Sequence, residues 1–220
     1  MPKIRDFRTS CSPLLTTKLL HAKKQDGQPA FNFADLRLLS IDFGEKQCLR
    51  YLLQNAMLLG KLHLLSTAFN QTFKGLHDVL SAGAGTIKAL NLTVFLDGNF
   101  NGTRVNRSFE GLSEELEAMA GRNTLESLSL RVQMNLYEKA DVIGSMIQNV
   151  EKVLVKPGWS SLRQVSVKVP VACCEKKNTC AKLAEELQSL LPDKYLSHLS
   201  KLESVTLNVS SYVAQCGCIG

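Results

Sequence analysis

The sequence predicts an α/β fold, a right-handed solenoid whose parallel sheet has helices on one face and an open second face. Three observations support this prediction. A motif of the form apolar-x-x-apolar-x-apolar recurs six times, helical apolar stripes separate its copies, and the outward strand positions are mostly polar. Repetition at a period of tens of residues is typical of chains in which each unit buries its apolar face against its neighbours.

The six motif copies predict six short strands. They begin at Leu36, Leu59, Ile87, Leu125, Leu162 and Leu202. In every copy the last two apolar residues are two positions apart, so both side chains point to the same face of a strand. The alternation continues through Val132, Val169 and Val209, which are β-branched residues that favour a half-buried strand.

Five apolar stripes with helical period separate these strands. They cover residues 49–57, 69–80, 112–120, 146–154 and 183–191, and they end near Gly60, Gly83, Gly121, Pro157 and Pro192. Glycine just after a helix and proline beyond it are typical stop signals. Strands that alternate with helices across short connections are expected to be parallel, with right-handed crossovers.

The polar outward positions distinguish this fold from a doubly wound sheet, whose central strands are apolar on both faces. We therefore expect one sheet face to be open. The units grow from roughly 23 to about 40 residues, longer than most leucine-rich repeats, and the Asn or Cys typical of those repeats is missing. The prediction is an irregular leucine-rich-repeat-like solenoid.

Three segments are expected along the chain. Residues 1–33 read as an irregular polar arm, residues 34–212 as the solenoid of about six units, and residues 213–220 as a Cys-containing tail. Inserted loops are expected at 97–107 and 172–179. Because so few residues follow the sixth strand, its edge is expected to lack a covering helix, which indicates a fragment or an edge protected by dimerisation or by a partner.

Composition favours a protein of the cell interior. Hydrophobic residues make up 45% of the chain and charged residues 21%, with a formal net charge of +6. No apolar run is long enough to span a membrane, and the N-terminus lacks the apolar core of a signal peptide. We therefore expect a cytoplasmic or nuclear location and no membrane association. Nucleic acid is a disfavoured partner, because no helix carries a dense Lys/Arg stripe.

Four short segments carry a family resemblance. They read Gly-Leu-Ser-Glu-Glu-Leu at 111–116, Asn-Thr-Leu-Glu-Ser-Leu at 123–128, Pro-Gly-Trp-Ser-Ser-Leu at 157–162 and Leu-Ser-His-Leu-Ser at 196–200. Over residues 34–210 the chain resembles fungal, basidiomycete-type leucine-rich-repeat proteins that are often grouped with F-box proteins. The resemblance implies protein binding. It also implies an alternative, the substrate-recognition subunit of an F-box-type ubiquitin ligase that contacts a ligase adaptor, with the F-box missing from this chain.

No catalytic motif is found, so we expect neither an enzyme nor a cofactor. The four histidines, His21, His63, His77 and His198, lie in separate units without a paired acid. The cysteines offer one alternative. Five of them, Cys173, Cys174, Cys180, Cys216 and Cys218, follow the last two strands and would meet at one end of the sheet. Such thiolates could hold zinc, but their spacing is not that of a zinc knuckle, and reduced, unligated cysteines are expected inside a cell.

Partner contact is expected on the open sheet face. The candidate residues are His63, Asn91, Thr93, Ser129, Arg131, Ser166, Lys168 and Thr206. Loops 97–107 and 172–179 would form the rim. Short polar side chains on rigid strands lose little entropy on binding, which suits recognition of a partner protein.

Overall fold

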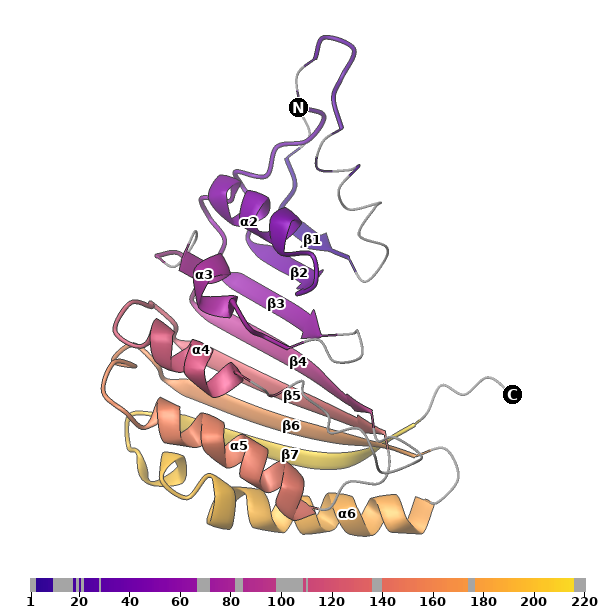
Figure 1. Cartoon of the computed structure of the whole chain (residues 1–220), viewed down its shortest axis with the longest axis vertical. Coiled ribbons are helices and arrows are strands. Elements are labelled where there is room, and N and C mark those ends of the chain that lie inside the picture. The colour runs from indigo at the N-terminus through magenta and orange to yellow at the C-terminus, as the bar shows by residue number, and fades with distance from the viewer. Residues whose placement is uncertain are drawn as a thin grey trace.

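The computed structural model of the chain describes residues 3–9, 18, 20, 22–27, 29–66, 72–81, 85–97, 109, 111–135, 140–173 and 177–215. It is an α/β structure with one seven-stranded sheet (Figure 1). Every strand is parallel to its neighbour, and the strands lie in sequence order. They are β1 (Asp6–Arg8), β2 (Leu38–Asp42), β3 (Lys61–Ser66), β4 (Ala89–Asp97), β5 (Ser127–Asn135), β6 (Gln164–Cys173) and β7 (Thr206–Gln215). All six predicted strands are present.

The helices lie together on one side of the sheet (Figure 1). They are α2 (Lys46–Asn55), α3 (Leu76–Leu80), α4 (Leu112–Met119), α5 (Ala140–Leu154) and α6 (Lys177–Leu190). Pro192 was expected to end the last helix, but a π-helical turn, Leu191–Tyr195, continues through it. Pro192 lies where the α-helical pattern of α6 changes to the π-helical one, so its missing N–H falls at the junction of the two. A 3-10 turn, Leu199–Lys201, then leads towards β7.

Strand β1 corrects the prediction that residues 1–33 are irregular. Asp6, Phe7 and Arg8 pair with Leu38, Leu39 and Ser40 of β2, so the arm supplies the first strand of the sheet. Phe7 is buried, and its ring meets that of Phe33 edge-on with centroids 6.0 Å apart. A three-residue strand has a single inward side chain, so no alternation was visible in the sequence.

The core lies between the sheet and the helices. Strand register aligns one row of inward aliphatic residues, Leu39, Leu62, Leu90, Leu128, Val165 and Leu207. All but Leu207, on the last strand, are at most 2% exposed. Helix residues such as Leu52, Leu116 and Leu187 cover them and are fully buried. Met57 was expected in the first helical stripe, yet it is 76% exposed, because α2 ends at Asn55 and the chain turns.

Backbone hydrogen bonds link each unit to the next at the point where a strand begins. The carbonyl of Arg37 accepts from the N–H groups of Gly60 and Lys61 at 3.2 and 3.1 Å. The carbonyl of Gly60 in turn accepts from Lys88 and Ala89, each at 2.9 Å. The carbonyls of Lys88 and Glu126 likewise each accept two backbone N–H groups from the start of the next strand. Unit length varies between these points, from 23 residues between paired Leu38 and Lys61 to 42 between paired Gln164 and Thr206, as the motif spacing predicts.

The inserted loop expected at 172–179 is shorter than predicted. Strand β6 extends through Cys173, and α6 begins at Lys177. At the other expected loop, Asp97 is the last residue of β4, and 98–107 lie outside the described residues. Within the part of the chain that the structure describes, no helix has the length and apolar character needed to cross a membrane.

The outer edge of β7 is not bare, contrary to expectation. The N–H of Thr206 points to β6 and donates to the Arg163 carbonyl at 2.7 Å, so the N–H of Ser211, five residues on, points the other way. There it donates to Oε1 of Gln188 on α6 at 2.7 Å. The Gln188 amide also donates to the Val209 carbonyl at 3.5 Å. Helix α6, which precedes β7 in the chain, therefore covers part of the edge.

Candidate functional site

The face of the sheet opposite the helices carries polar side chains in register across the strands. One row follows the pairings Arg8, Ser40, His63, Asn91, Ser129, Ser166 and Asn208. A second row follows Asp42, Leu65, Thr93, Arg131, Lys168 and Ser210. A third row follows Asp6, Leu38, Lys61, Ala89, Ser127, Gln164 and Thr206. We call this surface the open face. All eight predicted contact residues lie on it, because strand side chains alternate between faces with a period of two.

The eight predicted residues differ in how much surface they offer. Lys168 and Thr206 are exposed, and His63, Asn91, Ser129 and Arg131 are half-buried. Thr93 and Ser166 are only 4% and 9% exposed, so their side chains have little area available for contact. Their burial depends on the larger side chains around them, which an outward position in a strand pattern does not reveal.

His63 lies near the centre of the open face between two hydroxyls. Its Nε2 is 2.8 Å from Oγ1 of Thr93, and its Nδ1 is 3.3 Å from Oγ of Ser40. Burial lowers the pKa of His63 below 6.5, and the positive charges of Arg131, Arg8 and Lys61 lower it further.

The cations of the open face have no acidic partner among the described residues. Arg8, Lys61, Arg131 and Lys168 make no ion pair there. Four cations elsewhere in the described chain make ion pairs: the ammonium groups of Lys3, Lys88, Lys156 and Lys194 lie 2.5–3.0 Å from Asp35, Glu126, Glu117 and Asp141. Sequence analysis missed Arg8 because β1 was missed, and it did not single out Lys61.

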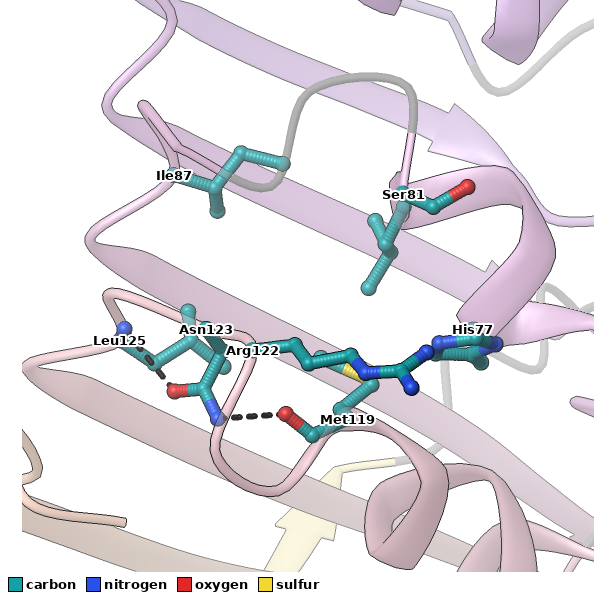
Figure 2. Close-up of a pocket in the computed structure, with 8 residues that line it drawn as sticks. His77, Ser81, Ile87, Met119, Arg122, Asn123 and Leu125 are labelled. Atoms are coloured by element: carbon teal, nitrogen blue, oxygen red, sulfur yellow. Dashed lines mark hydrogen bonds between the residues drawn. The ribbon is translucent and has the colours of Figure 1, made fainter. Parts of the chain in front are cut away.

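A cavity of about 260 Å³ lies on the helix side, between the ends of α3 and α4 (Figure 2). Its apolar walls include Leu80, Ile87 and Met119. Figure 2 shows Arg122 extended across it towards His77. The polar side chains of Ser81 and Asn123 are engaged by nearby backbone groups, Ser81 with the Asp78 carbonyl at 2.7 Å and Asn123 with the Met119 carbonyl at 2.8 Å. This hollow is mainly apolar and is separate from the open face.

The proposed thiol cluster falls largely outside the described residues, which exclude Cys174, Cys216 and Cys218 and the side chain of Cys173. Cys180 is fully buried in α6. Among the described residues no group of His, Cys, Asp and Glu side chains is arranged to hold a metal ion.

The open face therefore offers a partner hydrogen-bond donors, hydrogen-bond acceptors and positive charge on a rigid sheet. No known protein family, curated protein or solved structure matches this chain. We therefore infer its function from the geometry of this surface.

Proposed function

We propose that the chain is an irregular leucine-rich-repeat-like solenoid that acts as a non-enzymatic protein-interaction module through its open face. The repeated backbone hydrogen bonds at the strand starts support the solenoid, because each unit contacts the next in the same way. The strand order supports it too, since every strand pairs only with its neighbours in sequence.

One observation carries the proposed function: polar side chains stand in register across parallel strands on a face that α2 to α6 leave uncovered. The opposite face of the same strands holds a continuous aliphatic core, which fixes the backbone beneath these side chains. Recognition by such a surface loses little conformational entropy, because Ser, Thr and Asn have few rotatable bonds.

The density of short side chains favours contact with another protein. Asn91 and Ser129 are adjacent across β4 and β5, with Ser166 beside them on β6. Asn91 and Ser129, which are half-buried, supply an amide and a hydroxyl group that match the backbone and side chains of a polypeptide. Interfaces of ordinary size contain about ten direct hydrogen bonds.

Affinity capture with two matched double variants tests the proposal. Asn91→Arg with Ser129→Arg places bulky cations in the middle of the open face. Asn149→Arg with Ser189→Arg makes the same chemical changes at exposed positions of α5 and α6. We expect the first pair to abolish capture of the proteins that the unaltered chain retains, and the second pair to keep it. Equal capture by both variants would place the interaction elsewhere.

A further inference from the structure

A turn of the same form leads into four of the repeated strands. The N–H groups at the starts of four motif copies, those of Leu36, Leu59, Leu162 and Leu202, donate to the carbonyl three residues earlier at 3.0, 3.5, 3.0 and 3.2 Å. The residues that supply these carbonyls are apolar and buried in the core, and they are Phe33, Ala56, Trp159 and Leu199. Each of these units therefore inserts one apolar side chain at its turn. We call that side chain the plug of the unit.

Arg122 departs from this pattern in the unit that contains β5. It stands three residues before Leu125, at the position of the plug, and it is exposed. The Leu125 N–H donates instead to Oδ1 of Asn123 at 3.1 Å. Ala84, at the same position before β4, lies outside the described residues. In the β5 unit a charged, exposed residue therefore replaces the plug.

The cavity of about 260 Å³ on the helix side lies at this position. Its walls include Leu80 at the end of α3, Met119 at the end of α4, and Ile87 and Leu125 at the starts of two motif copies. The two helices, five and eight residues long, extend about 8 and 12 Å along their axes. Strand β4, with nine residues, extends about 30 Å. Short helices and a missing plug together leave the space open.

We infer that this cavity binds a small, uncharged, planar aromatic molecule whose ring takes the place of the missing plug. The site is on the opposite side of the sheet from the open face, so it goes beyond the proposed function. Two units fill the plug position with aromatic rings, those of Phe33 and Trp159, which indicates the shape of group that this position accommodates. An apolar cavity of about 150 Å³ is large enough to bind benzene, so a volume of about 260 Å³ suffices for one ring or a fused pair.

The side chains around the cavity favour an aromatic ring over an aliphatic one. Arg122 extends across the cavity (Figure 2), and a guanidinium interacts favourably with the face of an aromatic ring. The thioether of Met119 makes favourable contacts with ring edges. The hydroxyl of Ser81 and the amide of Asn123 are already engaged by backbone groups, so the ligand needs no polar groups to satisfy them.

The charges near the cavity favour an uncharged ligand. Arg122 points towards His77, and two carboxylates lie beside that histidine. Oδ1 of Asp78 is 3.7 Å from the Nδ1 of His77, and Oε2 of Glu115 accepts the His77 backbone N–H at 2.8 Å. These carboxylates offset the positive charge of Arg122, so an anionic group would gain little there.

Methyl NMR of the unaltered chain tests the inference, because Leu80, Ile87, Met119 and Leu125 carry methyl groups in the cavity wall. The first probe is indole, the ring system of a tryptophan side chain. Benzyl alcohol, cyclohexylmethanol and benzoate form a matched set with one six-membered ring each. We expect indole and benzyl alcohol to shift these methyl resonances in a saturable way. Cyclohexylmethanol and benzoate should bind about threefold more weakly than benzyl alcohol, or weaker still.

Three protein variants localise the binding. Arg122→Trp supplies a plug, so it should abolish the shifts caused by indole and raise the midpoint of thermal unfolding by about 2–4 °C. Arg50→Trp makes the same change at an exposed position of α2 and should alter neither quantity. Arg122→Ala removes the guanidinium but leaves the apolar walls, so indole should bind about threefold more weakly.

Three results would each overturn the inference: no saturable shifts with indole, equal binding of indole by the unaltered chain and the Arg122→Trp variant, or tighter binding of cyclohexylmethanol or benzoate than of benzyl alcohol. The titrations of the unaltered chain decide the matter even where a variant fails to fold. None of these results bears on the open face, which the Asn91→Arg and Ser129→Arg changes test separately through partner capture.

Discussion

The carboxylate of Glu151 on α5 is fixed by the backbone of His198, whose N–H donates to Oε1 at 2.7 Å. The same oxygen accepts from the N–H of Leu199 at 3.0 Å, and the imidazole Nδ1 of His198 is 3.3 Å from Oε2. The Glu151 side chain is 1% exposed. This buried acid therefore ties α5 to the turn that precedes β7.

Glu151→Ala should lower the free energy of unfolding by about 2 kcal/mol or more, because two backbone N–H groups lose their acceptor in a buried place. Glu151→Gln keeps an acceptor oxygen and should cost less than half as much. Urea denaturation of the three proteins measures both values. A loss below about 0.5 kcal/mol for the alanine variant would show that water or another group replaces the carboxylate.

Gly144 on α5 lies against the ring of Tyr195. A Cβ at this position would overlap three ring atoms of that tyrosine. The tyrosine hydroxyl also contacts the carboxylate of Asp141. Gly144→Ala should therefore displace the ring and destabilise the protein by about 1–3 kcal/mol, although alanine favours a helix.

Gly60→Ala is the matched control for that change, because a Cβ on Gly60 meets no atom within 4 Å. Thermal unfolding should show a lower midpoint for the Gly144 variant and little change for the Gly60 variant. A Gly144 variant as stable as the unaltered chain would mean that the ring moves aside without cost.

Gln188 protects the outer edge of β7. Strand β7 has ten residues with no charge and no proline, features that leave a strand edge prone to pairing with another chain. Gln188→Ala would free the Ser211 N–H and the Val209 carbonyl, so we expect concentration-dependent self-association by analytical ultracentrifugation. Ser189→Ala, the next residue on α6, should leave the chain unchanged. If both variants sediment alike, α6 itself rather than the amide protects the edge.

The pKa of His63 predicts a pH dependence of stability. Burial and the nearby cations lower the folded-state pKa below 6.5, so the unfolded chain takes up the proton first as the pH falls. Stability attributable to His63 is therefore present above about pH 6.5 and lost as the pH falls towards the folded-state pKa.

His63→Gln should reduce this loss, because glutamine keeps hydrogen-bonding atoms near Ser40 and Thr93 but does not titrate. Urea denaturation from pH 8 down to about pH 5 compares the two proteins across the unperturbed histidine pKa. If the free energies of unfolding of the two proteins changed equally with pH over that range, the assigned direction of the pKa shift would be contradicted.

The faces of the strands could be predicted from sequence because the alternation is local. Leu62 and Leu64 point inward and His63 points outward whatever the rest of the chain does, so the core and the open face followed from spacing alone. Phe7 gave no such signal, since one inward residue does not make a pattern. The burial of Thr93 depends on neighbours from other strands.

Two features of the candidate site could not be predicted without the register of the strands. Arg8 and Arg131 lie more than a hundred positions apart in the sequence, and only the pairing of five strands places them on one face. Which cations make ion pairs likewise depends on which carboxylates come near. Lys88, for example, meets Glu126 at 2.7 Å because their units are neighbours.

Hydroxyl-radical footprinting of the chain with a captured partner tests the central claim most directly. Tyr212 is 41% exposed and pairs with Pro170, which places it on the open face with His63, whereas Met57 is 76% exposed beyond the end of α2. All three side chains react readily with the radical. We predict that the partner protects His63 and Tyr212 from oxidation and leaves Met57 fully reactive. Protection of Met57 with unchanged oxidation of His63 and Tyr212 would contradict the assignment of the open face as the interaction surface.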